Sequence, residues 1–540
     1  MWQPGWRDEI WAQLDQKWDL IVIGGGITGA GILREATRAG LKTLLVEGND
    51  FSSGTSSRSS KLVHGGFRYL KNGQVKLTLI SVRERERLLR EGRGLVIPLG
   101  FLMANFRTDR LPTWLFGVGL TVYDMLALKW SHRYYDSPGI QELCPQLNDR
   151  ELLGGYRYFD AETDDARLVL RVIREAVRQG GLALNYARVE GMIFSQAGQV
   201  CGVQLRDLDP EAAGRTAEAR SRVVINATGA WANELRTLAL KNNIPRGGQL
   251  SPRLRHLRGS HLIFPESKLP LNRAVCLWHP TDGRPVFAFP WEGVTIIGTT
   301  DVDHGCEALT DPKISLAEVE YLLAVANYAF PCLNLALDDV QGTFSGIRAV
   351  LDTGKADPSK ESREHVLWNE NGLITVTGGK LTTFRVMAHD TLRAARTLLP
   401  GRPVFNPHCT VLETPPANIL GEAPLGGAAR LRLLGRYGAD APELIAAAPT
   451  GELQTIASSP VLWAELRWAA RAEGVIHLDD LLLRRVRLGL LLPQGGIPCL
   501  DSFRRVIQAG LEWNDLRWEQ EVENYSRLWE RSYSLHCLVT

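Results

Sequence analysis

The sequence predicts an α/β protein with two different sheet regions, followed by a C-terminal all-helical domain. Three observations support this fold class. Residues 19–47 alternate strand, helix and strand patterns around a glycine turn. Residues 256–303 hold short apolar runs separated by proline and glycine, which is typical of an antiparallel sheet. Residues 421–533 carry Leu, Ala and Arg at helical spacing, and a domain boundary is expected near 401–412.

The first unit predicts a dinucleotide site. It reads as a buried strand over 20–23, a helix over 30–39 and a second strand over 41–46. Between the first strand and the helix lies a G-x-G-x-x-G turn formed by Gly24, Gly26 and Gly29. Such glycines allow a tight turn, close approach to a pyrophosphate and close helix packing, and Glu47 stands where a ribose hydroxyl needs an acceptor. NAD and FAD satisfy this pattern equally.

The amino-acid composition limits the classes of protein to which the chain can belong. The chain has 540 residues, 44% of them hydrophobic and 23% charged, which predicts two or three globular domains. A net charge of +2 gives no support for nucleic-acid binding. Eight scattered cysteines without a C-x-x-C pair indicate reduced thiols in a cytosolic compartment, and no metal site is expected. We also expect neither a signal peptide nor a membrane-spanning segment.

One apolar segment leaves two interpretations open. Residues 111–128 are apolar but interrupted by Asp124, and basic residues flank them on both sides: Arg107, Arg110, Lys129 and Arg133. The segment is either a buried helix or an interfacial helix that lies in one leaflet of a membrane, with its basic flanks at the headgroups.

Further elements follow from local patterns. The Ser- and Gly-rich stretch 48–66 is too long for a simple connector and predicts a functional loop. Helices are expected over 76–90 and 316–330 and a strand over 182–186, together with strands over 200–205 and 222–231 and a strand, glycine turn and helix over 372–399. The return of the chain to a glycine-marked strand at 227–229 and again at 378–380 favours a flavin, whose long body meets a second domain.

Nine segments carry a resemblance to one family: DLIVIGGGITGAG (19–31), TSSRSSKLVHGGFRYL (55–70), DDARLVL (164–170), INATGAW (225–231), RGSHLIFP (258–265), IIGTTD (296–301), SGIR (345–348), TGGKLTT (377–383) and HLDDLLLRRVRLG (477–489). On these motifs the chain resembles the FAD-dependent glycerol-3-phosphate dehydrogenases of the aerobic, respiratory kind. The resemblance covers most of the chain. The last motif is interpreted as a solvated charged face or internal ion pairs rather than a docking face.

The resemblance implies a fold and a division of the chain. A Rossmann-like FAD-binding domain is expected in the discontinuous segments 18–110, 150–245 and 345–400. An antiparallel-sheet substrate domain is expected over 246–344, so that residues 18–400 form the FAD-dependent oxidoreductase region. Residues 401–540 form the C-terminal helical cap domain.

The resemblance also implies an activity. The family oxidises sn-glycerol 3-phosphate to dihydroxyacetone phosphate by hydride transfer from C2 to flavin N5, and passes the electrons to membrane quinone. A cytoplasmic protein held peripherally at the inner face of the cell membrane is therefore expected, with a homodimer as one candidate assembly and no nucleic-acid partner. The alternatives are a glycerol-3-phosphate oxidase that uses oxygen, an amine or amino-acid oxidase of the same superfamily, and a flavin-bound scaffold or redox sensor without turnover.

Candidate site residues come from the matched motifs. Cations suit a phosphate dianion, and a histidine has a pKa suited to accepting the hydroxyl proton. The resemblance implies that the substrate pocket contains Arg68, Tyr69, Arg348 and Lys380, with His64 or His261 as the base. For the cofactor it implies Gly24, Gly26, Gly29, Glu47, Thr55, Ser56, Ser57, Ser59, Lys61, Leu62, His64, Ala227, Gly229, Gly379, Leu381 and Thr382.

Overall fold

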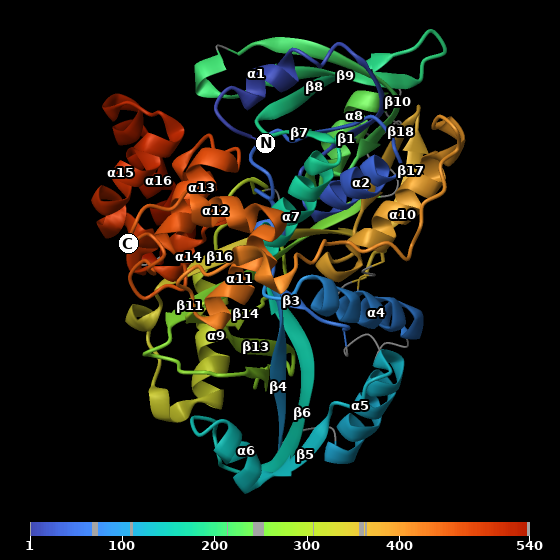
Figure 1. Cartoon of the computed structure of the whole chain (residues 1–540). Coiled ribbons are helices and arrows are strands. Elements are labelled where there is room, and N and C mark those ends of the chain that lie inside the picture. The colour runs from blue at the N-terminus through green and yellow to red at the C-terminus, as the bar shows by residue number, and fades with distance from the viewer. Residues whose placement is uncertain are drawn as a thin grey trace.

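Two sheets organise the chain in the computed structural model (Figure 1). The structure describes residues 2–66, 74–107, 112–212, 214–240, 253–305, 307–355, 361 and 364–536. The first sheet consists of β1 (Lys17–Ile23), β2 (Thr43–Val46), β7 (Leu182–Leu184), β8 (Ala187–Phe194), β9 (Val200–Asp207), β10 (Thr216–Asn226), β17 (Val366–Glu370) and β18 (Leu373–Thr377). Its main path has the order β17-β18-β10-β1-β2-β7, and β8 and β9 extend from β10.

Parallel pairing in the first sheet creates a common edge. β1 pairs in parallel with β2 and β10, β10 pairs in parallel with β18, and β2 with β7. The carboxyl ends of β1, β2, β10 and β18 therefore lie at the same edge of the sheet, where open α/β sheets bind ligands.

The predicted β-α-β unit is confirmed. Helix α2 (Ile27–Arg38) connects β1 and β2, and it begins three residues earlier than the pattern predicted. α2 packs with α7 (Asp165–Arg178) and α10 (Phe384–Ala395) over one face of the sheet, where the three helices share a hydrophobic core with β1 and β10. On the other face, α1 (Trp6–Trp11) and α8 (Ala232–Leu240) pack with β8, β9 and β10.

The second sheet is larger than the sequence predicted. It consists of β3 (Leu62–Val63), β4 (Val96–Phe106), β5 (Arg133–Asp136), β6 (Leu152–Thr163), β11 (Leu254–Pro265), β12 (Ala274–Trp278), β13 (Pro285–Trp291), β14 (Val294–Gly298), β15 (Val302–Asp303) and β16 (Gly342–Leu351). The antiparallel region predicted over 256–303 corresponds to β11–β15. However, β4, β6 and most of β16 lie in segments that the expected division assigned to the first domain. A strand pattern does not show which distant strand it pairs with, and the β12–β4 pairing is parallel and non-local.

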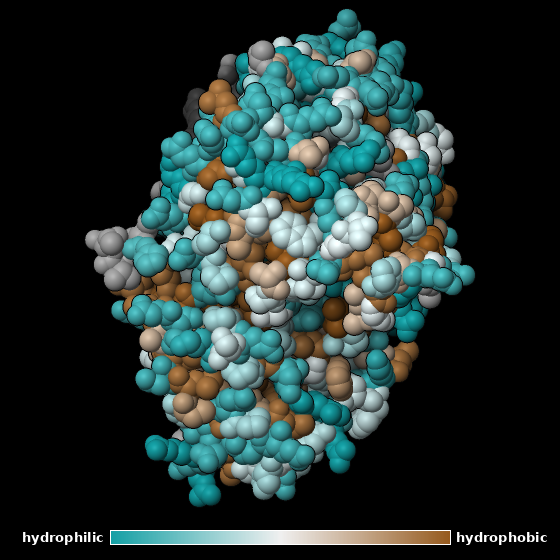
Figure 2. Space-filling view, turned by 60° about the vertical axis from the view of Figure 1, so that its left-hand side comes forward, coloured by the Kyte–Doolittle hydropathy of each residue, from teal (hydrophilic) through white to brown (hydrophobic). Residues whose placement is uncertain are grey.

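Helices cover both faces of the second sheet. α6 (Ser137–Leu143) and α9 (Leu316–Ala329) pack on one face. The C-terminal region packs on the other face through α13 (Trp463–Ala472), α14 (Leu488–Leu491), α15 (Leu500–Leu511) and α16 (Asp515–Tyr533). Its helices α11 (Gly427–Tyr437) and α12 (Ala441–Ala446) pack against α13 in a separate core. This confirms the helical character of the C-terminal region. On the surface that Figure 2 shows, hydrophilic residues dominate the top and bottom, and hydrophobic residues gather across the middle.

Helix α5 (Thr113–Ala127) is buried on one face only. Phe116, Leu120 and Tyr123 are buried, whereas apolar side chains project into solvent from the opposite face and the turn that follows: Trp114, Leu115, Val118, Met125, Leu128 and Trp130. The interpretation of this segment as a buried helix is therefore wrong. α5 packs against α4 (Val75–Glu91) and β6, at the end of the molecule away from the C-terminal helices (Figure 1). Within the described ranges, no helix is long and apolar enough to cross a membrane.

Six of the eight cysteines belong to the part of the chain that the structure describes. All six are free thiols: Cys144, Cys201, Cys276, Cys332, Cys409 and Cys499. The same described residues hold no group of three or more His, Cys, Asp or Glu side chains that could bind a metal ion.

Candidate functional site

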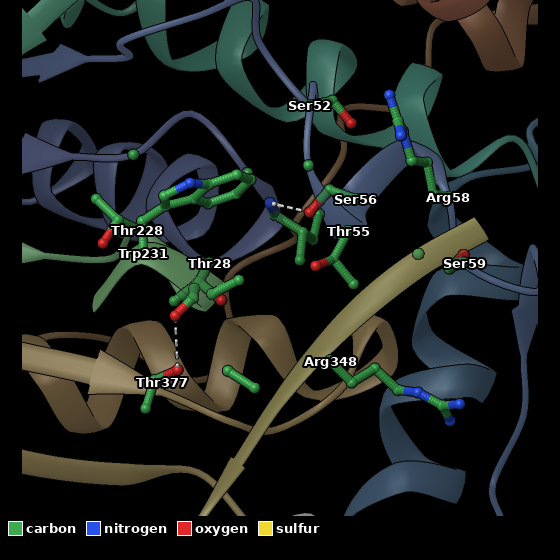
Figure 3. Close-up of a pocket in the computed structure, with 18 of the residues that line it drawn as sticks. Thr28, Ser52, Thr55, Ser56, Arg58, Ser59, Thr228, Trp231, Arg348 and Thr377 are labelled. Carbon is green, nitrogen blue, oxygen red and sulfur yellow. Dashed lines mark hydrogen bonds between the residues drawn. The ribbon is translucent and has the colours of Figure 1, made fainter. Parts of the chain in front are cut away.

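A cavity of about 590 Å³ opens at the carboxyl edge of the parallel strands (Figure 3). The segments that follow β1, β2, β10 and β18 all contribute to its wall, through Gly24, Glu47, Ala227 and Gly378 among others. Further wall residues come from the loop 52–60 and from β11 and β16 of the second sheet. The first sheet and the second sheet therefore meet around one cavity.

The glycine turn is closed by backbone contacts that only glycine permits. Gly24 has a φ of 112°, and a Cβ there would lie 2.6 Å from the carbonyl oxygen of Ala227. A Cβ on Gly29 would lie 1.9 Å from the carbonyl oxygen of Gly24, so Gly29 sets the close approach of α2 to the turn. Gly26 is the N-cap of α2 and lines the cavity. The N-terminus of α2, with the positive end of its dipole, thus opens toward the cavity, as a pyrophosphate requires.

Glu47 follows β2 and lies at the wall of the cavity. Its Oε2 accepts a hydrogen bond of 2.7 Å from the Gly25 amide, and its Oε1 accepts one of 2.8 Å from the Asn49 amide. Burial raises the pKa of this carboxyl. Because a carboxylate offers about four lone-pair sites, Glu47 can also accept hydrogen bonds from ribose hydroxyls.

The serine-rich loop lines the cavity with some of its side chains and anchors itself with others. Ser56 Oγ accepts a 3.0 Å hydrogen bond from the Ile27 amide at the start of α2, and Figure 3 draws this contact. Thr55, Ser59 and Leu62 also line the cavity. Ser52 Oγ is a buried hydroxyl without a hydrogen-bond partner among the described residues, so it is placed to serve a ligand.

Two predicted cofactor residues in this loop direct their side chains away from the cavity. Lys61 is fully buried, and its Nζ donates to the carbonyl oxygen of Ser57 at 3.1 Å and to Asp165 at 3.2 Å. Ser57 is also buried, and neither of the two residues is part of the cavity wall. A loop lacks the periodicity of a helix or strand, so the sequence could not show which way these side chains point.

The second sheet supplies two of the predicted substrate residues. His261 on β11 and Arg348 on β16 both line the cavity. In the register of the two strands, Leu257 pairs with Arg348 and His261 pairs with Phe344. Because side chains alternate along a strand, His261 and Arg348 lie on the same face of the sheet.

His261 is held in its neutral form. It is buried, its Nε2 lies 2.8 Å from Ser60 Oγ, and its ring stacks on Phe344 with centroids 4.4 Å apart. Burial first, and then the charges of Lys61 and Arg348, lower the pKa of His261 well below its ordinary value. A neutral imidazole is the form that can accept a proton.

The cations Arg348 and Lys380 contact neighbours and still line the cavity. Arg348 Nη2 lies 3.2 Å from Asp301 Oδ1 and donates to the carbonyl oxygen of Thr300 at 3.1 Å. The Arg348 side chain is 26% exposed. Lys380 Nζ donates to Ser81 Oγ at 3.1 Å.

The remaining predicted residues divide into three groups. His64 and five predicted cofactor residues also line the cavity: Ala227, Gly229, Gly379, Leu381 and Thr382. Gly29 shapes the turn from outside the cavity wall. Arg68 and Tyr69 lie outside the described residues.

Several wall residues were not singled out from the sequence, among them Arg58, Arg188 and Trp231. Arg58 is buried, forms an ion pair with Asp311 and lies over the ring of Tyr533 in α16 at 5.6 Å. The Trp231 indole packs on Gly54, where an added Cβ would lie 3.0 Å from the ring (Figure 3). Arg58 and Trp231 both lie inside quoted motifs, at 55–70 and 225–231, but neither was among the candidates named from those motifs.

Comparison with known proteins agrees with the cavity's geometry. The profile of the FAD dependent oxidoreductase family matches residues 19–385, and that of the C-terminal domain of alpha-glycerophosphate oxidase matches residues 413–517. The fold and the site therefore define an FAD-dependent oxidoreductase, and the cofactor of this class is FAD. The glycine turn, the open N-terminus of α2 and the acceptor Glu47 fit that cofactor.

Similar proteins narrow the class. The chain is 34% identical over 541 residues to glycerol-3-phosphate dehydrogenase 2 of Mycobacterium bovis, covering 97% of this chain and 90% of the relative. It is 38% identical over 387 residues to the aerobic glycerol-3-phosphate dehydrogenase of Bacillus subtilis, covering 71% and 67%. The solved glycerol-3-phosphate dehydrogenase of Bacillus halodurans with FAD superposes with a TM-score of 0.77 at 28% identity and 98% coverage of both chains. The chain belongs to the family of FAD-dependent, aerobic glycerol-3-phosphate dehydrogenases, as its motifs predicted.

Proposed function

We propose that the chain oxidises sn-glycerol 3-phosphate to dihydroxyacetone phosphate with FAD. Its membership of the family supports this substrate, and one observation supports the placement of the site: Arg348, Lys380, His64 and His261 line the same cavity as the glycine turn. Substrate phosphate and alcohol groups would then lie beside the cofactor. Bound FAD would accept the hydride that leaves C2 of the substrate, which makes it the two-electron oxidant.

The cations have a direct role in this proposal. Arg348 presents a planar fork that can bind two phosphate oxygens, and Lys380 adds a compact second charge. Arg68 and Tyr69 complete the proposed pocket on the strength of the motif alone. The phosphate thereby fixes the position of C2 relative to the cofactor.

A histidine accepts the hydroxyl proton. Loss of the C2 hydride and the O–H proton together converts the alcohol into the ketone, so a base must stand near the hydroxyl. His261 is neutral and borders the cavity, and His64 stands beside Gly65 and Gly66 on the same cavity wall. Both remain candidates for the base.

A pair of arginine variants tests the pocket. Arg348 and Arg284 both pair with Asp301, at 3.2 Å and 3.4 Å, and their side chains are 26% and 30% exposed. Only Arg348 lines the cavity. We expect Arg348→Met to raise KM for glycerol 3-phosphate by about 10- to 100-fold, because a hydrogen bond to a charged group contributes about 1.5–3 kcal/mol. Arg284→Met is the matched control, and an equal rise in KM for both variants would refute the assignment of Arg348.

An anaerobic visible spectrum tests the reaction itself. Flavin bands that bleach on addition of sn-glycerol 3-phosphate would establish substrate and cofactor together. Bands that persist with this substrate and bleach with an amino acid would favour the amine or amino-acid oxidase alternative. Reoxidation by a quinone analogue, compared with reoxidation by dissolved oxygen, then separates a dehydrogenase from an oxidase.

We further propose membrane quinone as the acceptor, with the protein held at the inner face of the cell membrane through α5. The exposed apolar face of this helix carries two tryptophans in or beside it, Trp114 and Trp130, which are 65% and 70% exposed. Exposed Lys129 and Arg133 lie next to it, so the surface suits anionic headgroups over an apolar interior. With 15 residues, α5 is shorter than the ~20 that span a bilayer, and lying in one leaflet suits its length.

Vesicle binding tests this attachment. We expect Trp114→Ser combined with Val118→Ser to weaken binding to vesicles that contain phosphatidylglycerol by about tenfold or more, since two large side chains lose apolar burial. Leu516→Ser, at a residue 76% exposed on α16, is the matched control. Unchanged vesicle binding of the α5 variant would refute this surface without affecting the proposed oxidation.

A further inference from the structure

The motif HLDDLLLRRVRLG at 477–489 has no part in the proposed reaction, yet its charges are deeply buried. Residues Asp480–Arg485 form a π-helical turn, and Arg487 follows with a left-handed φ of 64° before α14. Side chains of Arg484, Arg485 and Arg487 are at most 5% exposed. Buried cations require partners, and π-helical turns are frequent at functional sites.

Two of these arginines hold the segment that follows Glu47. Arg485 donates to both carboxylate oxygens of Asp50, each at 2.7 Å, and Arg484 Nε donates to Asp50 Oδ2 at 2.6 Å. Although burial acts in the opposite direction, these two cations lower the pKa of Asp50 to about 2. Residues 48, 49, 52 and 53 around Asp50 line the cavity. The C-terminal region therefore fixes the loop at the ribose end of the site.

Arg487 contacts both the serine-rich loop and the start of α7. Its Nη2 donates to the carbonyl oxygen of Ser57 at 2.8 Å and to Asp165 Oδ1 at 2.9 Å. The other oxygen of Asp165 accepts hydrogen bonds from the Ser59 amide at 3.0 Å and the Ser59 hydroxyl at 2.7 Å. Lys61 shares both acceptors of Arg487 and is likewise fully buried.

The clamped loop also reaches the proposed substrate end. Ser59 and Ser60 line the cavity, and the Ser60 hydroxyl lies 2.8 Å from His261 Nε2. A shift of this loop would therefore change both the wall of the cofactor cavity and the contact of the candidate base. Asp165 is the first residue of α7, so the loop is tied to a rigid helix as well as to the C-terminal region.

We propose that Arg484, Arg485 and Arg487 are positioning residues for FAD: the C-terminal region clamps the two loops, 48–53 and 55–61, that border the cofactor cavity. This assigns the region a part in cofactor binding beyond its packing on the second sheet. This proposal requires that FAD binds in the cavity, but it does not depend on the identity of the substrate.

FAD binding to the apo protein tests the clamp. FAD is removed, and the apo variants are titrated with FAD while flavin fluorescence is followed. We expect Arg487→Met to raise the dissociation constant for FAD by about tenfold or more, because Ser57 of the loop and Asp165, which holds Ser59, each lose a hydrogen bond from a cation. The matched control is Arg174→Met, at a buried arginine of α7 that pairs with Asp440 of the C-terminal region but contacts neither loop.

The outcomes separate positioning from stability alone. Both variants are expected to lower the melting temperature of the apo protein, but only Arg487→Met should weaken FAD binding and increase hydrogen exchange over 48–61. Equal dissociation constants for FAD in the two variants would overturn the proposal. If Arg487→Met does not fold, Asp165→Asn weakens the same contact from the α7 side, and unchanged FAD affinity in that variant would overturn the proposal as well.

Discussion

Glu162, in the second sheet, offers a pH-dependent test of the electrostatics of a buried carboxyl. It lies on β6, where it pairs with Leu62 of β3 and Ile97 of β4. Its Oε2 is buried and has no hydrogen-bond partner among the described residues. Burial, with a contribution from the nearby carboxylate of Glu292, raises the pKa of Glu162 to about 8.

The sign and size of the effect follow from this pKa. The unfolded chain releases the proton near pH 4.5, whereas the native protein keeps it to about pH 8. Native stability therefore falls as pH rises through this window, by up to about 4.8 kcal/mol, which is about 3.5 pH units at about 1.36 kcal/mol each. The whole side chain is partly exposed, so solvent screens the effect, and we expect about 2 kcal/mol at pH 8.

Glu162→Gln removes the titration while keeping the shape. We expect the variant to match the parent near pH 4.5 and to melt about 2 °C higher at pH 8, if 540 residues unfold with about 2.1 cal/mol/K each. Melting temperatures would be compared from pH 5 to pH 8.5, with Glu320→Gln on the exposed side of α9 as a control. A difference between Glu162→Gln and the parent that stays constant across this range would refute the reasoning.

Two further substitutions test the turn and the loop near the proposed substrate. Gly29→Ala places a Cβ 1.9 Å from the Gly24 carbonyl oxygen and should yield protein without bound FAD, whereas Gly426→Ala, at an open position, should keep its flavin absorbance. Tyr123→Phe removes a hydroxyl that donates to Asp160 at 2.8 Å, and Asp160 accepts a 3.2 Å hydrogen bond from the Gly65 amide. We expect a severalfold higher KM for glycerol 3-phosphate and an unchanged flavin spectrum. An unchanged KM would show that Tyr123 does not support the His64 loop.

The cofactor end of the site was predictable because its signals are local. The strand, glycine turn, helix and acidic residue of 19–47 are adjacent in sequence. The glycines and the acidic residue each have a known structural role in a dinucleotide site. The structure places Gly24 and Gly26 at the edge where the parallel strands end, and Glu47 at the same edge. Directions of side chains in the serine-rich loop were not predictable, because Lys61 is turned toward Asp165 of α7 and the backbone of Ser57 is held by Arg487.

Non-local pairing explains most of what the sequence did not predict. The segments that form β4 and β6 were assigned to the FAD-binding domain without a strand being predicted there, but both strands join the second sheet through partners far away in the chain. Likewise, α5 was identified as apolar and helical, but the burial of only one face depends on its packing against α4 and β6. The charged motif 477–489 was interpreted as a solvated face or as internal ion pairs; its arginines form internal ion pairs, and their partners, Asp50 and Asp165, could not be named from the sequence.

The open space between the side chains of His261 and Arg348 on the second sheet also has a structural cause. Gly259 pairs with Gly346 in the β11–β16 register, midway between the pairs that contain His261 and Arg348 and on the same face. A Cβ on Gly259 would lie 2.6 Å from Arg348 Nη2, and one on Gly346 would lie 2.4 Å from the Arg58 carbonyl oxygen. Two glycines opposite each other therefore clear the face of the sheet between a candidate base and the cation proposed to bind the phosphate. Because a shift of one residue in this register would turn one of the two strands over, the pairing of β11 with β16 is itself a condition for the proposed chemistry.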